Sequence, residues 1–101
     1  MNSLVYPLTL YYDSACPLCR AEMHNLMLRN TAQRLRFIDV SVRDFDAAAV
    51  GIPMHDLLAL MHARRADGLL VKGVDVFRLA YAAADLPMVS RVLTWPGLAQ
   101  L

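Results

Sequence analysis

Hydrophobic runs and helical patterns follow one another along the chain. The apolar and β-branched stretches Leu4–Tyr12 and Leu35–Val40 predict two buried strands, the first with Pro7 near its start or at an irregularity. Residues 16–30 between them predict a helix, with Asn30 as a left-handed terminator. The apolar residues of this helix fall on one face: Cys19, Met23, Leu26 and Met27. A strand, a helix of this length and a second strand predict a right-handed crossover with parallel strands.

The second half of the chain predicts helices and a hairpin. The expected elements are, in order, helical segments at 44–50 and 53–57, strands at 58–64 and 69–72, and helices at 74–84 and 87–94. Gly51 is expected to end the first of these helices, and Asp75 to open the one at 74–84. Asp67-Gly68 between the two strands is a hairpin signal. The whole pattern predicts an α/β fold, β-α-β-α-β-β-α plus a C-terminal helix, with helices on both faces of a four-stranded mixed sheet.

Length and composition predict one folded domain. The 101 residues have room for a single domain over 1–101. Hydrophobic residues make up 57% of the chain, which argues against disorder. This high fraction also leaves apolar surface for a substrate groove, a partner face or a tightly filled core.

The charge balance excludes two classes of partner. Ten basic and nine acidic residues give a net charge of +1, which provides no strong attraction for nucleic acid or an anionic membrane. No uncharged stretch has the roughly 18 apolar residues that a membrane span needs. Met1–Tyr12 has no Lys or Arg and contains Pro7, so it makes a poor signal peptide. We therefore expect a cytoplasmic protein; the sequence does not indicate its oligomeric state.

Cys16 and Cys19 are the only cysteines, and they form one CxxC. A bridge between them closes a loop too small to restrain the unfolded chain much. In a reducing compartment, redox chemistry or metal binding is the better reason for such a pair. Zinc prefers four ligands, and only His24, His55 and His62 are available to complete the set, so metal binding is the weaker alternative.

The CxxC lies where the first strand passes into the first helix. A helix N-terminus presents unpaired N–H groups and a partial positive charge, which stabilise a thiolate. Pro17 suits the first helical turn. We expect Cys16 to be the exposed nucleophile and Cys19, one turn inward on the same side of the helix, to be the resolving thiol.

Two charged residues near the CxxC each have two interpretations. Arg20 projects toward the side of Cys16 and would favour its thiolate, or it is an ordinary solvated helix residue. Asp13 is a helix cap or Asx-type turn, or a carboxylate that moves protons to or from Cys19. A negative charge there opposes thiolate formation, so the catalytic and electrostatic effects of Asp13 have opposite directions.

The segment from Tyr12 to Arg20, YDSACPLCR, resembles the DCC family of thiol-disulfide oxidoreductases, named for Asp-x-x-Cys-x-x-Cys. Later blocks are also similar to that family: 35–40, 61–63, 67–68, 73–78 and 93–97. The resemblance implies a thioredoxin-like fold with sheet order 2-1-3-4. It also implies dithiol–disulfide exchange at Cys16 and Cys19 without a metal or organic cofactor, with Asp13 as the third motif residue.

The resemblance also suggests partners and supporting residues. The substrate would be a protein or small-molecule disulfide, and the Cys-Pro-x-Cys form, similar to glutaredoxins, suggests glutathione. Thioredoxin-like enzymes place a cis-proline before the third strand, but Pro53 lies several residues too early. Either the third strand starts sooner than predicted, or another residue such as Met61 or His62 serves the groove. The candidate supporting or substrate-binding residues are Pro17, Arg20, His62 and Gly73. The alternative function is a thioredoxin-like binding or adaptor module without turnover.

Overall fold

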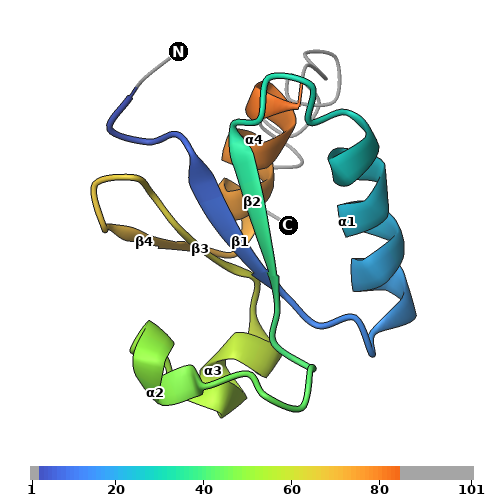
Figure 1. Ribbon diagram of the computed structural model, residues 1–101, viewed down its shortest axis with the longest axis vertical. Helices are drawn as coiled ribbons and strands as arrows, with labels where there is room; N and C mark the ends of the chain where they lie inside the picture. Colours follow the sequence, from blue (N-terminus) through green and yellow to red (C-terminus); the bar gives the residue numbers. More distant parts are fainter. Residues whose placement is uncertain (1–2, 85–101) are drawn as a thin grey trace.

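A four-stranded mixed sheet forms the centre of the protein (Figure 1). The structure, a computed structural model, describes residues 3–84. In the order β2-β1-β3-β4, the strands are Leu35–Asp39, Leu8–Tyr12, His62–Arg64 and Leu70–Lys72. β1 runs parallel to β2 and antiparallel to β3, and β3 and β4 form an antiparallel hairpin. This order confirms the predicted thioredoxin-like α/β fold.

Four helices flank the sheet in the described part of the chain. They are α1, Pro17–Leu28; α2, Ala47–Val50; α3, Met54–Ala59; and α4, Val74–Ala83. Helices α1 and α4 pack in one apolar cluster on one face of the sheet, whereas α3 packs in a second cluster on the other face. Figure 1 shows α2 and α3 together near the end of the sheet where β1 leads into α1. The helix predicted at 87–94 lies outside the described residues.

The alternation of side chains along β1 builds both clusters. Leu8 and Leu10 are fully buried on the α1–α4 side, whereas Tyr11 points to the α3 side. The first cluster includes Met23, Leu26, Val76 and Ala80, and the second includes Val40, Ile52 and Leu57. Each large apolar side chain buried in this way contributes roughly 1.5–3 kcal/mol relative to exposure. The central strand is therefore held from both faces.

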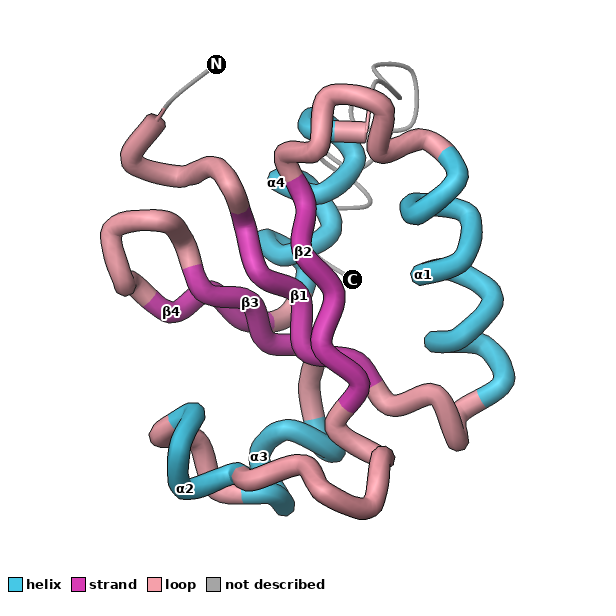
Figure 2. The backbone as a smooth tube through the Cα atoms, viewed as in Figure 1, coloured by secondary structure: helices cyan, strands magenta, loops and turns pink. Residues whose placement is uncertain are grey.

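The parallel register of β1 and β2 brings two loops together. Leu8 pairs with Leu35 and Tyr12 pairs with Asp39, so the carboxyl ends of the two strands coincide. Figure 2 shows the loops that follow β1 and β2 at the same end of the sheet. The CxxC follows the first of these loops, so its position depends on this register.

The end of α1 differs from the prediction that Asn30 is left-handed. The helix ends at Leu28, and Gln33 is the non-glycine residue with a left-handed backbone, at φ 54°. The side chain of Asn30 instead binds the backbone of β2: its Nδ2 donates to Leu35 O at 2.8 Å, and its Oδ1 accepts from Leu35 N at 3.1 Å. A side-chain amide can donate and accept at the same time, so in this position Asn30 pairs with both the N–H and the C=O of Leu35.

The two inner strands of the sheet, β1 and β3, are shorter than predicted. β1 starts at Leu8, because Leu4 and Val5 accept backbone hydrogen bonds from the hairpin turn at Asp67 and Ala66. In the predicted strand 58–64, residues up to Ala59 belong to α3 and only His62–Arg64 are extended. A short apolar run fits a buried helix turn as well as a strand, and burial of Leu57 favours the helix here.

The predicted opening of α4 by Asp75 is also wrong. The helix follows Gly73, whose φ of 72° and ψ of −142° strongly favour glycine. Asp75 lies inside the first turn and pairs with Arg78 at 2.7 Å. The predicted end of α2 at Gly51 is confirmed, since this residue is left-handed at φ 82°.

Replacement of Asn30 by Ala is expected to destabilise the protein by about 1–3 kcal/mol, because the backbone N–H and C=O of Leu35 both lose their side-chain partner. Urea denaturation measures the loss. Asn25→Ala is the matched control, since Asn25 is exposed and accepts only a long bond of 3.5 Å from Arg29; its effect should stay within about 0.5 kcal/mol. Equal stability of the two variants would contradict this role of Asn30.

Candidate active site at the start of the first helix

The loop from β1 into α1 is a tight turn built on Asp13. The Asp13 carbonyl accepts a hydrogen bond from Cys16 N at 3.1 Å, and its Oδ1 accepts one from Ala15 N at 2.9 Å. The second bond is the Asx-type turn expected from the sequence. Asp13 is not the helix cap itself. Its two hydrogen bonds stabilise the turn that places Cys16 at the start of the helix.

Cys16 is the N-cap residue of α1. Its backbone is extended, at φ −88° and ψ 113°, and its Sγ accepts a hydrogen bond from Cys19 N at 3.4 Å. Pro17 follows as the first helical residue, where its missing N–H costs nothing. The two cysteines are free thiols and are both half-buried. The sulfur of Cys16 thus takes the place usually filled by a Ser, Thr, Asp or Asn oxygen.

The two thiols have opposite pKa shifts. A side-chain hydrogen bond with Cys19 and the backbone N–H of Cys19 hold the pKa of Cys16 below its ordinary value. The same side-chain bond, together with burial, raises the pKa of Cys19 to about 11. The charge of Asp13 raises both pKa values by a smaller amount. Of the two thiols, Cys16 is therefore the one that ionises more readily, while Cys19 stays protonated at neutral pH.

The carboxylate of Asp39, at the end of β2, forms a hydrogen bond with the loop between β1 and α1. Asp39 Oδ1 accepts hydrogen bonds from Ser14 N at 3.2 Å, Ser41 N at 2.9 Å and Ser41 Oγ at 2.7 Å. The hydroxyls of Ser14 and Ser41 are also 2.8 Å apart. These three residues are not among the predicted site residues, because the expected parallel crossover brings the two strand ends together without showing which side chains form hydrogen bonds there.

The charge of Asp39 persists across the pH range of the thiols. Partial burial by itself raises the pKa of Asp39, but the hydrogen bonds from Ser14 and Ser41 outweigh it and lower the pKa to about 2. A depressed carboxyl pKa stabilises the fold above the ordinary value, and this contribution is lost as the pH falls through about 2. The link between the two loops is thus intact wherever Cys16 titrates.

A small hollow opens beside the thiols. Its volume is about 140 Å³, and it is lined by Tyr11, Asp13, Cys16, Cys19 and the run Leu57–Met61. The run comes from the end of α3 and the segment that leads into β3. The structure therefore brings together the three predicted residues Asp13, Cys16 and Cys19 around one space.

Met61 occupies the position directly before β3 and lines the same hollow as the two thiols. Pro53 precedes α3 and is separated from β3 along the chain by that helix, as the sequence indicated. Two bonds hold the backbone next to Met61: Gly73 N donates to Met61 O at 3.0 Å, and His62 Nδ1 donates to Leu60 O at 2.9 Å. Gly73 and His62 thus brace the wall of the hollow, although neither lines it.

Two further sequence candidates lie apart from the hollow. The side chain of Arg20 is exposed and makes no hydrogen bond or ion pair with any described residue. The ring of His62 is buried and lines a different hollow, between Ile52, Asp56 and Lys72. Whether Arg20 supports the thiolate or is only solvated stays a prediction.

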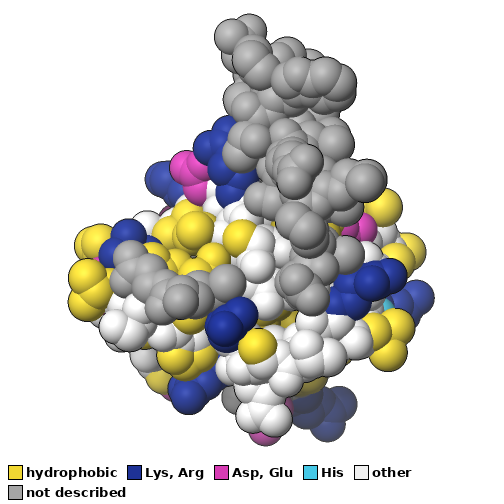
Figure 3. All heavy atoms as spheres, turned by 90° about the horizontal axis from the view of Figure 1, so that it is seen from above, with side chains coloured by type: hydrophobic (Ala, Val, Ile, Leu, Met, Phe, Trp, Pro, Cys, Tyr) yellow, Lys and Arg dark blue, Asp and Glu magenta, His cyan; other side chains and the backbone are white. Residues whose placement is uncertain are grey.

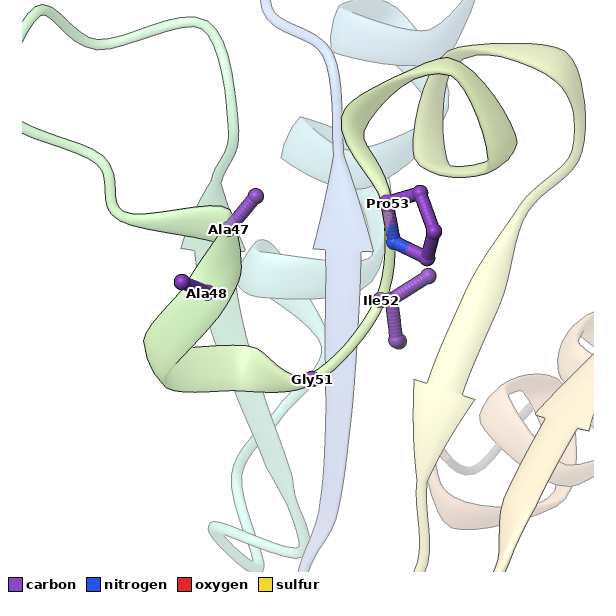
Figure 4. Close-up of a pocket in the computed structure, with 5 residues that line it drawn as sticks. All are labelled: Ala47, Ala48, Gly51, Ile52 and Pro53. Atoms are coloured by element: carbon purple, nitrogen blue, oxygen red, sulfur yellow. The ribbon is translucent and has the colours of Figure 1, made fainter.

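A larger hollow lies away from the thiols, between α2 and the segment that leads into α3 (Figure 4). It has a volume of about 390 Å³ and is lined by Ala47, Ala48, Gly51, Ile52 and Pro53. None of these side chains is charged or nucleophilic. Size alone therefore does not identify the site, and the chemistry lies beside Cys16.

Other ligand classes find little support in residues 3–84. No group of three or more His, Cys, Asp or Glu side chains there is arranged to hold a metal ion. None of the helices described is long and apolar enough to cross a membrane. On the face shown in Figure 3, the Lys and Arg side chains are scattered and do not gather into one patch.

The fold and the site together define a thioredoxin-like protein with a dithiol at the start of its first helix. A family model described as DCC1-like thiol-disulfide oxidoreductase matches residues 10–101, and the chain belongs to this family. An uncharacterized chloroplastic protein of Arabidopsis thaliana is 31% identical over 98 residues, which cover 95% of this chain and 46% of the relative. The chain thus spans less than half the length of that relative. No solved structure matches the chain.

Replacement of Cys19 by Ala is expected to raise the pKa of Cys16, because it removes the side-chain hydrogen bond that lowers this pKa most while leaving the backbone N–H of residue 19. The rate of Cys16 alkylation by iodoacetamide, followed against pH, should then show its inflection at higher pH than in the parent chain. In Cys19→Ser the hydroxyl still donates, so the inflection should move less. An inflection that stays in place in Cys19→Ala would rule out this hydrogen bond.

Proposed function

We propose that this protein catalyses dithiol–disulfide exchange through Cys16 and Cys19. The observation that carries the proposal is the capping of α1 by the Cys16 sulfur, with its lowered pKa, next to a protonated Cys19. A thiolate is the attacking form of cysteine, and a partly exposed one at a helix N-terminus is typical of exchange enzymes. Membership of a thiol-disulfide oxidoreductase family supports the same activity.

The reaction would follow two exchanges. The Cys16 thiolate attacks one sulfur of a substrate disulfide, the substrate S–S bond breaks, and the leaving thiolate takes up a proton from water. Cys19 then loses its proton and attacks the Cys16 sulfur, which releases the second substrate thiol. The substrate disulfide has gained two electrons, and Cys16 and Cys19 have become a disulfide. An external dithiol would restore the reduced pair.

Asp13 is our candidate for the base that accepts the Cys19 proton. The pKa of Cys19 is about 11, so few of its thiols are ionised at neutral pH and the second exchange needs help. The carboxylate lines the same hollow as both sulfurs. Its charge alone raises the pKa of Cys19, so any gain in rate must come from proton transfer rather than from electrostatics.

Cys19→Ser should trap a mixed disulfide through Cys16, since the first exchange proceeds and the second has no thiol. Mass spectrometry of the full chain after incubation with a model disulfide, such as hydroxyethyl disulfide, measures the adduct. Cys16→Ser is the control, and it should form far less adduct, because burial still raises the pKa of Cys19 when the Cys16 thiol is absent and keeps this thiol less reactive. Equal trapping by the two variants would overturn the roles assigned to the cysteines.

Asp13→Asn should slow only the second exchange. The amide oxygen still accepts the Ala15 hydrogen bond, so the turn persists while the charge and the base are lost. Loss of the charge lowers the pKa of both thiols, so attack by Cys16 should be as fast as before or faster. Stopped reactions analysed for the mixed disulfide should show it accumulating. If the second exchange accelerates instead, Asp13 acts only through its charge.

A further inference from the structure

We infer that the substrate of this site is a disulfide in a polypeptide whose cysteine is flanked by apolar, uncharged side chains, and not the disulfide of glutathione. The inference rests on the proposed function, because it concerns what the Cys16 thiolate attacks. Three features of the hollow beside the thiols carry it: its apolar rim, the sign of its charge and its size.

The rim of the hollow is apolar and accessible. Five consecutive residues line it, Leu57, Leu58, Ala59, Leu60 and Met61. Leu57 is buried and belongs to the core, whereas Leu58 and Leu60 are 55% and 52% exposed. Two half-exposed leucines beside a reactive thiol leave apolar area that a substrate would remove from water. Apolar side chains next to the substrate cysteine fit this surface.

The charge of the hollow disfavours glutathione. Among residues 3–84, Asp13 is the only acidic or basic residue that lines it. Glutathione carries more carboxylates than ammonium groups and is anionic, so it would need basic partners. Arg20 is exposed but does not line the hollow, and Lys72 lines a different one. An uncharged peptide segment meets no such repulsion.

The size of the hollow also favours a polypeptide. Sites for small molecules have volumes of roughly 300–1,000 Å³, which surround most of the ligand. The hollow beside Cys16 has about 140 Å³, which is room for one side chain next to the reacting sulfur. A polypeptide can place one apolar side chain there and rest the remainder on the exposed leucines.

The experiment compares three disulfide probes on the full reduced chain, by the second-order rate of thiol release. The first is a synthetic peptide disulfide with Leu and Phe flanking the cysteine and both ends blocked, the second has Ser and Glu as flanks, and the third is oxidised glutathione. We expect the first to react at least about tenfold faster than the others, the gain expected from burying one apolar side chain.

Variants of Leu58 test whether the preference for the apolar peptide arises at the rim of the hollow. Leu58→Glu and Leu58→Lys should both slow the apolar peptide about tenfold relative to hydroxyethyl disulfide, which is too small to cover the rim. Leu28→Glu is the matched control, because Leu28 is 83% exposed at the far end of α1 and should leave the ratio unchanged. Urea denaturation verifies that each variant is folded.

The outcomes separate the inference from the function on which it rests. Comparable rates for glutathione and the apolar peptide, or a rate ratio unaffected by both Leu58 variants, would overturn the inference while Cys16-dependent exchange stands. If none of the probes reacts in a Cys16-dependent way, the proposed function fails and the inference falls with it.

Discussion

One atom, the Sγ of Cys16, both caps α1 and is the proposed nucleophile. The Sγ of Cys16 accepts the backbone N–H of Cys19 and so begins α1. The side-chain hydrogen bond with Cys19 lowers the pKa of Cys16 most, and the capping N–H lowers it further. At other helix starts a neutral hydroxyl or a carboxylate fills this place. When a thiol is the cap, the hydrogen bond that stabilises the helix start also stabilises the thiolate. Helix formation and activation of the nucleophile are therefore coupled through one contact.

Contacts elsewhere in the fold fix the segments on either side of the Cys16 cap. The parallel register of β1 and β2 puts Asp39 beside the loop that carries Cys16, and its hydrogen bonds to Ser14 and Ser41 join the two strand ends. On the opposite wall, Gly73 and His62 fix the backbone on either side of the Met61 position. The cis-proline of the described residues, Pro7, precedes β1 and belongs to neither of these segments.

The sequence predicts the part of this arrangement that is local. A proline inside a CxxC, directly after a strand, places Cys16 at a helix start, and the period of Met23 and Leu26 predicts the buried face of α1. Contacts between distant segments leave no such pattern. The bond of Asn30 to Leu35 and the link from Ser14 to Asp39 depend on how strands meet. The run at 57–61 is ambiguous because its apolar residues fit a helix turn and a strand equally well.

The most direct test is a pH titration of the two cysteines in the reduced parent chain, followed residue by residue through their Cβ chemical shifts in NMR spectra. The structure predicts two separate transitions, with Cys16 ionising below the ordinary cysteine value and Cys19 ionising near pH 11. Two coincident transitions at the ordinary value would contradict the account, because a sulfur that caps the helix must hold its negative charge more readily than a free thiol.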